Sequence, residues 1–328
     1  METVIIESDK LCKHFCIPVQ KSGIGNALKQ FVHKEQKTVH AVNDVSLRIH
    51  KGEFVGFLGP NGAGKTTTLK MLTGILYPTR GTACVLGYTP HERNYDFLRR
   101  ISFVSGQKQL LMPDLPPLDS FALLKEIYDI PKVDYVKRLD EMVTLLGLEK
   151  ILTTQVRRLS LGEKMKSELV AALLHNPEVI FLDEPTIGLD VISQNNIWRF
   201  LRDHNVKNNS TIILTSHYLE DIQRLCKRVI IINSGEKIYD GELDKLILSA
   251  GNYKNIHCVF SSKVETKDLK EYGKVIEYND MSATLRIKQD TLKVIIPKLL
   301  GALPIADLSI TSPEARDVIA TLYEKSLK

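Results

Sequence analysis

The segment from Gly59 to Thr67 has the residue types and spacing that most clearly indicate chemistry in this 328-residue chain. It reads Gly-Pro-Asn-Gly-Ala-Gly-Lys-Thr-Thr, and it lies between an apolar run typical of a strand, 53–58, and a helical pattern over 67–73. Glycines let the backbone fold closely around phosphate, so that several N–H groups point at the anion. The following helix adds its positive end. The sequence therefore predicts a site for a nucleoside triphosphate.

Single positions in this loop suggest separate roles. Lys65 is placed to bridge the β- and γ-phosphates, and the Thr66 hydroxyl to bind Mg²⁺. A chance glycine-rich turn is the alternative, but the complete pattern between a strand and a helix argues against it. The remaining predicted nucleotide contacts in the loop are Gly59, Asn61, Gly62, Ala63, Gly64 and Thr67.

Two adjacent acids follow a second predicted strand, 179–182. Asp183 at the carboxyl end of this strand suits the water shell of Mg²⁺, and Glu184 beside it can polarise an attacking water. Two acids at a strand end are a weak signal alone, because exposed loop carboxylates are common. Combined with the phosphate loop, they predict a site that hydrolyses the nucleotide.

Four further segments with polar residues lie near predicted strands or helices. A small Ser-x-Gly turn before the helical run 164–175 is a second potential anion site, because helix N-termini attract anions. In chain order these segments are Gln107 after the strand predicted over 101–104, Ser160-Leu161-Gly162, Gly188-Leu189-Asp190, and Ser216-His217 after the strand predicted over 211–215.

In this order the six motifs resemble those of the ATP-binding cassette (ABC) family, specifically the nucleotide-binding subunit of an ABC transporter. The resemblance covers roughly residues 4–245. It implies an α/β P-loop NTPase fold with a helical subdomain, and ATP and Mg²⁺ as the bound species. By the same resemblance, Glu184 is the general base, His217 holds the γ-phosphate and the water, and Gln107 senses Mg²⁺ and couples to the membrane partner.

The resemblance also implies a dimer, because two cassettes of this family pack head to tail around two ATP molecules. Ser160 and the Gly162 amide would then contact the γ-phosphate bound to the partner subunit, and Asp190 would link the two sites. This chain has one cassette, so the second subunit makes a homodimer or a heterodimer. The family stacks an aromatic ring on adenine, and Phe15 is the candidate, with a core position as its alternative.

The signature segment departs from the usual Leu-Ser-Gly-Gly-Gln. Leu161 replaces the first glycine and Glu163 the glutamine, which adds negative charge near the partner's ribose. Ser160 and the second glycine remain, so the contact in trans can survive. This variant signature resembles that of a bacterial subgroup that serves ABC-2-type permeases. Four other segments of the chain share the resemblance: 106–107, 114–116, 119–121 and 312–319.

This subgroup mostly exports its cargo. We therefore predict an ATP-hydrolysing subunit at the cytoplasmic face of the cell membrane, which drives export through separate integral membrane permease subunits. A soluble ABC ATPase acting on DNA or ribosomes is one alternative, and a cassette that binds ATP without hydrolysis is another. The net charge is only +5, from 44 basic and 39 acidic residues that interleave, so no nucleic-acid partner is expected.

The chain divides into two predicted domains. Residues 1–245 form the nucleotide-binding domain, with an insertion at 17–39 that carries a short helix over 26–34, and a helical subdomain at 107–175 that is helical over 113–148. Cys12, His14 and Cys16 share one face of a strand, but a fourth zinc ligand is missing. Residues 246–328 form a small α+β accessory domain, with strands predicted at 255–261, 274–279, 282–288 and 304–310 and helices at 264–272, 290–300 and 313–326.

Overall fold

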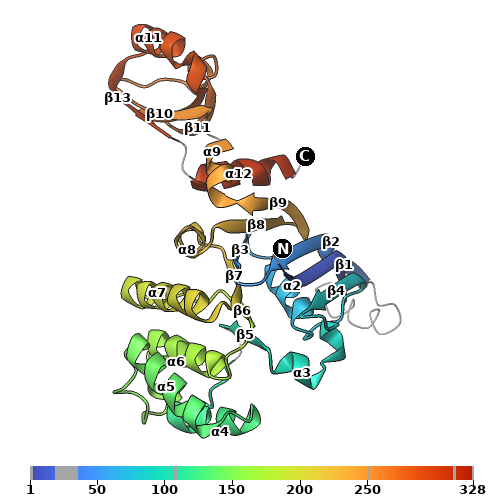
Figure 1. The fold of residues 1–328 in the computed structure, drawn as a ribbon. Coiled ribbons are helices and arrows are strands. Elements are labelled where there is room, and N and C mark those ends of the chain that lie inside the picture. Colours follow the sequence, from blue (N-terminus) through green and yellow to red (C-terminus); the bar gives the residue numbers. More distant parts are fainter. Residues whose placement is uncertain (1–2, 19–35, 107–108, 250–251, 313–314, 327–328) are drawn as a thin grey trace, which may run out of the picture. The chain divides into compact units, whose positions relative to one another are not determined.

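The computed structural model describes residues 3–18, 36–106, 109–249, 252–312 and 315–326 (Figure 1). The chain forms two compact units, Met1–Asp240 and Gly241–Lys328. The domain boundary predicted after residue 245 falls inside helix α9 (Leu243–Ser249). Gln107 and the predicted helix 26–34 lie outside the described residues. Within the described part of the chain, every helix is too short or too polar to cross a membrane.

A six-stranded sheet of order β5-β6-β7-β3-β8-β9 forms the centre of the first unit. The strands from β5 to β8 in this order pair in parallel. Every residue of β6 and β7 is buried, which explains their nearly continuous apolar sequences. The predicted α/β fold is confirmed. The bounds are β3 (Phe54–Leu58), β5 (Ile101–Ser105), β6 (Val179–Asp183), β7 (Thr211–Ser216), β8 (Arg228–Asn233) and β9 (Glu236–Glu242).

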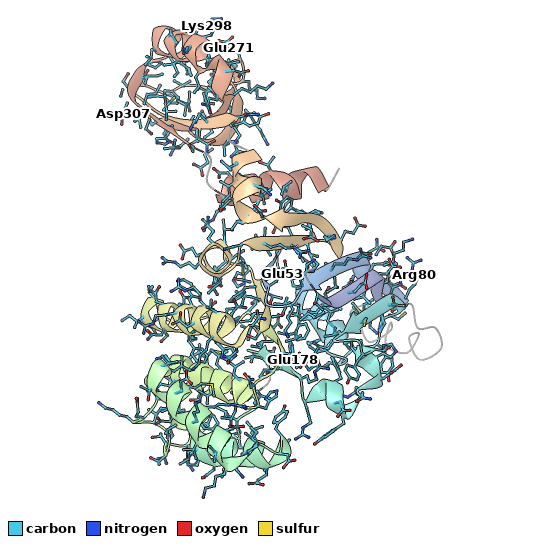
Figure 2. All side chains as sticks on the ribbon, in the orientation of Figure 1. Glu53, Arg80, Glu178, Glu271, Lys298 and Asp307 are labelled. Carbon is cyan, nitrogen blue, oxygen red and sulfur yellow. The ribbon has the colours of Figure 1, made fainter. Side chains whose placement is uncertain are left out.

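An ion pair fixes the amino ends of two neighbouring strands. Arg228 at the start of β8 donates from Nη1 to Glu53, which precedes β3 and is labelled in Figure 2, at 2.9 Å. Its Nε donates to Asp240 at 2.9 Å. Ion pairs therefore occupy the amino edge of the sheet. The loops at the opposite, carboxyl edge of the sheet are where ligands bind in α/β folds.

A second, antiparallel sheet of order β2-β1-β4 was not predicted. Its strands are β1 (Val4–Pro18), β2 (Gln36–His50) and β4 (Arg80–Val85). Ile6, Val45 and Leu69 lie in one buried core with Phe57 of β3 and Phe181 of β6. The other helices around the central sheet are α2 (Lys65–Leu72), α3 (Tyr95–Leu98), α7 (Val191–Asn208) and α8 (Leu219–Leu225).

The helical subdomain contains α4 (Pro117–Ile127), α5 (Lys132–Leu146) and α6 (Leu161–Leu173). Figure 1 shows these helices grouped beyond the β5 edge of the central sheet. The segment predicted to be helical over 113–148 contains the two helices α4 and α5. Asp129 has a positive φ of 53°, and Pro131 disfavours helical backbone at the residue before it, so the chain turns between them.

The second unit is built on a four-stranded antiparallel sheet of order β11-β12-β10-β13. Its element order, β-α-β-β-α-β, is that of the ferredoxin-like split βαβ motif. Ile256, Phe260, Leu285 and Leu299 pack in its core. The predicted small α+β domain is confirmed. The bounds are β10 (Tyr253–Phe260), α10 (Thr266–Leu269), β11 (Lys274–Asn279), β12 (Ser282–Lys288), α11 (Leu292–Ala302), β13 (Ile305–Thr311) and α12 (Ala315–Ser326).

A neutral histidine makes the first unit sensitive to acid. The ring of His175 stacks on Tyr128 with centroids 3.9 Å apart, and its Nε2 lies 3.1 Å from the Ile101 carbonyl oxygen. Burial is the main cause that lowers the pKa of His175 to about 4. The unfolded chain binds this proton near pH 6.5. The stability that the neutral ring contributes is therefore present above pH 6.5 and lost as the pH falls toward 4.

We expect His175→Phe to retain the stacking and remove this titration. Between pH 7 and pH 4.5 the wild type should lose up to about 3 kcal/mol more unfolding free energy than the variant. Chemical denaturation at the two pH values measures the difference. Burial also lowers the pKa of His204 to about 4. His204 is present in both proteins, so its contribution cancels in the difference between their losses of unfolding free energy. Equal losses in the two proteins would show that His175 does not titrate as described.

Candidate functional site

The loop between β3 and α2 requires glycine at several positions. Gly62 and Gly64 have φ values of 80° and 104°, in the left-handed region that favours glycine. A Cβ on Gly64 would lie 2.4 Å from the Ala41 carbonyl oxygen, and one on Gly59 would lie 2.4 Å from that of Ile232. The loop thus lies between a strand and a helix, as predicted, and other backbone packs closely around it.

Lys65 places a cation at the base of this loop. Its side chain is 5% exposed, and Nζ donates to the carbonyl oxygens of Gly59 at 2.6 Å and Pro60 at 3.2 Å. Burial is the largest influence and lowers the pKa of Lys65, while the charges of Glu184 and Asp183 oppose it. Nζ lies 3.8 Å from Glu184 Oε1. A buried ammonium with acids on one side can hold an anionic ligand.

Asp183, the last residue of β6, meets two hydroxyl groups. Thr66 Oγ1 donates to its two carboxylate oxygens at 2.8 and 3.0 Å, and Thr215 Oγ1 donates at 2.7 Å. Carboxylate and hydroxyl oxygens are ligands that Mg²⁺ accepts. The predicted metal-binding residues Thr66 and Asp183 are therefore brought together from α2 and β6, and their chemistry fits the ion.

Glu184 has an uncommon backbone conformation. Its φ of 54° is sparsely populated by residues other than glycine. The conformation is held by its N–H, which donates to Thr215 at the carbonyl oxygen (3.1 Å) and at Oγ1 (3.2 Å). His217 Nδ1 lies 3.3 Å from Glu184 Oε1, in an orientation that makes no hydrogen bond. The two predicted catalytic side chains thus face each other.

A cleft of about 580 Å³ opens beside Lys65, Thr66, Asp183 and Glu184, and His217 is outside its lining. Its volume lies within the usual range for small-molecule sites. Ser105 and Gly106, directly before Gln107, form part of its wall. The complete lining is Ala41, Asn61, Gly62, Ala63, Gly64, Lys65, Thr66, Thr67, Ser105, Gly106, Asp183, Glu184 and Ile187.

The signature segment forms a capping box at the start of α6. Ser160 Oγ and backbone N donate to Glu163 Oε2 at 2.7 and 2.9 Å, and the Glu163 N–H donates to Ser160 Oγ at 3.3 Å. These bonds lower the pKa of Glu163. Glu163 therefore holds the Ser160 turn, a role that our sequence analysis missed. The Ser-x-x-Glu spacing was the available signal.

The Asp190 turn lies against this signature turn. Asp190 caps α7 by accepting from the Ser193 N–H at 2.9 Å and from Ser193 Oγ at 2.7 Å. A Cβ on Gly162 would lie 2.6 Å from Ser193 Oγ, and one on Gly188 would lie 3.2 Å from Leu161 Cδ2. Ser160, Gly162 and Asp190 are outside the lining of the cleft, so the structure places them together but apart from the phosphate loop.

Phe15 lies on β1 opposite Val39, partly buried, with Lys13 Nζ 5.4 Å from its ring centroid. It is also outside the lining of the cleft, so its contact with adenine stays a prediction. Cys12 donates to Asp44 Oδ1 at 3.1 Å. In the described residues, no group of three or more His, Cys, Asp and Glu side chains is placed to hold a metal ion.

Comparison with known proteins gives the family. A sequence profile described as ABC transporter matches residues 42–187, and one described as EvrA-like ABC transporter, C-terminal domain, matches residues 252–311. The chain is 34% identical over 230 residues to the ABC transporter ATP-binding protein NatA of Bacillus subtilis (strain 168), covering 70% of this chain and 93% of NatA.

Two further proteins agree with this result. The chain is 36% identical over 220 residues to the Nod factor export ATP-binding protein I of Burkholderia thailandensis, covering 67% of this chain and 72% of the relative. The dimeric structure of a bacterial ABC transporter cassette superposes with a TM-score of 0.60 at 25% identity, covering 73% of this chain and 98% of that one. The chain therefore belongs to the ABC transporter family, as an ATP-binding protein with an ABC ATPase domain.

Proposed function

We propose that this chain drives export through separate ABC-2-type membrane subunits, by closing a dimer on ATP and reopening it after hydrolysis. The convergence of Lys65, the Thr66–Asp183 pair and Glu184 on one cleft, with His217 beside Glu184, carries the proposal. These residues supply the charge, the metal ligands and the base that phosphoryl transfer to water requires.

The chemistry follows from the placement of these groups. The loop from Gly59 to Thr67 binds the triphosphate of ATP, and Lys65 offsets its negative charge. Mg²⁺ held by Thr66 and Asp183 would neutralise charge on the phosphate oxygens. Glu184 takes a proton from water as the water oxygen bonds to the γ-phosphorus. The bond to the β–γ bridging oxygen breaks, and ADP and phosphate leave.

Neighbouring groups complete the site. His217 Nδ1 lies 3.3 Å from Glu184 Oε1, and His217 would orient the water and the γ-phosphate. Gln107 directly follows Gly106, which lines the cleft, and would sense Mg²⁺ and the water. Phe15 stacks on adenine.

A second subunit supplies the signature. Ser160 and Gly162 lie outside the cleft formed by their own chain, which supports a contact with ATP bound by the partner. Asp190, packed with them, links the two sites. The similarity to a dimeric bacterial cassette supports this arrangement, in a homodimer or a heterodimer. ATP drives closure because it binds the closed dimer more tightly than the open one.

The membrane partner is inferred from the relatives, one of which is named a Nod factor export protein. The chain would bind its permease peripherally, at the cytoplasmic face of the cell membrane. Exposed apolar side chains of the helical subdomain, Met112 at 42% and Leu115 at 37%, offer a contact surface.

Affinity purification of the tagged chain from membranes in mild detergent, followed by mass spectrometry, tests the proposal. We expect a polytopic membrane protein in stoichiometric amount. Met112→Arg should lose this protein and keep ATP binding. Val206→Arg is the control, because it replaces another exposed apolar side chain, on α7 and 77% exposed. This variant should still retain the membrane protein. Recovery from the cytosol alone, with no membrane partner, would instead favour a soluble ABC ATPase.

A further inference from the structure

We propose that Asp221 is a positioning residue that fixes the Glu184 turn and the His217 turn relative to each other. The inference rests on the proposed function, because it takes Glu184 and His217 to act in hydrolysis. Asp221 lies on α8 and is 2% exposed, and it does not line the cleft. It would therefore act on the reaction only through other residues.

Three side chains from three different segments donate to this one carboxylate. Thr186 Oγ1 and Ser216 Oγ donate to Oδ2 at 2.8 and 2.6 Å. Trp198 Nε1 donates to Oδ1 at 2.8 Å. All three bonds are buried, and hydrogen bonds to an ionised acceptor are short and comparatively strong. The carboxylate thus connects the loop after β6, the end of β7 and helix α7.

Two of the donors lie directly beside the catalytic side chains. Thr186 is two residues after Glu184, in the turn where the Ile187 N–H donates to the Glu184 carbonyl oxygen at 3.3 Å. Ser216 immediately precedes His217, and Ser216 Oγ also accepts from the Tyr218 N–H at 2.8 Å. The backbone is thus held on both sides of His217. Through Asp221 these two turns share one anchor.

The consequence is specific to the chemical step. None of the bonds of Asp221 reaches the Gly59–Thr67 loop, so ATP binding does not depend on them. A displacement of about 1 Å of a catalytic group can slow a reaction about 100-fold. Asp221→Asn replaces one acceptor oxygen with an N–H₂ donor that faces hydroxyl or indole donors. It should therefore lower kcat roughly 10- to 100-fold and leave KM for ATP nearly unchanged.

Steady-state ATPase measurements on the full chain test this inference. Thr186→Val and Ser216→Ala each remove one donor and should each lower kcat. Combining either with Asp221→Asn should lower kcat by less than the product of the two separate effects, because the residues share one hydrogen-bond network. Asp240→Asn is the matched control, since this carboxylate bonds Arg228 and Lys237 at the other edge of the sheet, and its kcat should match the wild type.

The single tryptophan of the chain gives an independent signal. Emission of Trp198 should shift in folded Asp221→Asn and remain unchanged in Asp240→Asn. If Asp221→Asn does not fold, the two hydroxyl variants decide the matter alone. Wild-type kcat in Asp221→Asn, or in both hydroxyl variants, would overturn the positioning role. Full turnover in Glu184→Gln would instead overturn the proposed function, so the two failures are distinguishable.

Discussion

Replacing Glu184 with glutamine is expected to lower kcat by about 10²- to 10⁴-fold, the contribution of a general base. The amide has nearly the same shape as the carboxylate but cannot accept the proton of the attacking water. Lys65, Thr66 and Asp183 are untouched, so ATP should bind with nearly wild-type affinity. On the proposed mechanism, bound ATP that is not cleaved should keep the dimer closed. Phosphate release measures kcat, equilibrium dialysis measures ATP affinity, and light scattering measures the amount of dimer.

Glu178→Gln is the matched control for this experiment. Glu178, which is labelled in Figure 2, directly precedes β6 and Glu184 directly follows it, so the two glutamates lie at opposite ends of one strand. Glu178 accepts from Arg100 Nε at 2.6 Å, far along the strand from the cleft. Its variant should turn over ATP at the wild-type rate. Full turnover in Glu184→Gln would exclude Glu184 as the base.

Most of the site was predictable because its residues follow buried parallel strands. Continuous apolar runs such as 179–182 identify strands covered on both faces, and polar residues at their carboxyl ends meet at one edge of the sheet. Asp183 and Thr66 accordingly meet, although 117 positions separate them. The Gly59–Thr67 loop was recognised from local spacing alone.

Other features depend on tertiary contacts that no local pattern shows. The sheet formed by β1, β2 and β4 was missed, because its long strands carry several register shifts and many exposed polar residues. The Asp221 hydrogen bonds join residues 186, 198, 216 and 221, whose spacing follows no helical or strand period. The capping box of Ser160 and Glu163 is local, and it was overlooked because Glu163 was considered only as a departure from the family signature.

The proposed contact in trans between Ser160 and the partner's ATP predicts complementation between two inactive variants. Ser160→Arg blocks the signature of a subunit, and Lys65→Ala removes the phosphate contact of its own loop. Each variant alone should show less than about 1% of wild-type turnover, because both composite sites are damaged. In a mixed dimer, the intact loop of the first subunit faces the intact signature of the second, and one site is complete.

For a dimer of two copies of this chain, random mixing in equal amounts makes about half of the dimers mixed, each with one of two sites intact. If the sites act independently, the mixture should reach about one quarter of wild-type turnover. Phosphate release on titrating one variant into the other measures it. Substantial activity in Ser160→Arg alone would contradict the assignment of Ser160 to the partner's site.

Loss of the helix cap is a competing explanation for an inactive Ser160→Arg, since Ser160 also holds the first turn of α6. In a Glu163→Gln background, Ser160→Asp separates the two effects, because Ser160 Oγ donates to Glu163 and an aspartate there would otherwise face a second carboxylate. Aspartate is as good an N-cap as serine and glutamine suits a capping box, so α6 should keep its stability, but the aspartate charge would repel the partner's γ-phosphate. If the trans contact is the cause, Ser160→Asp in this background should be inactive by itself and complemented by Lys65→Ala to the same extent as Ser160→Arg. If the cap is the cause, Ser160→Asp should retain activity.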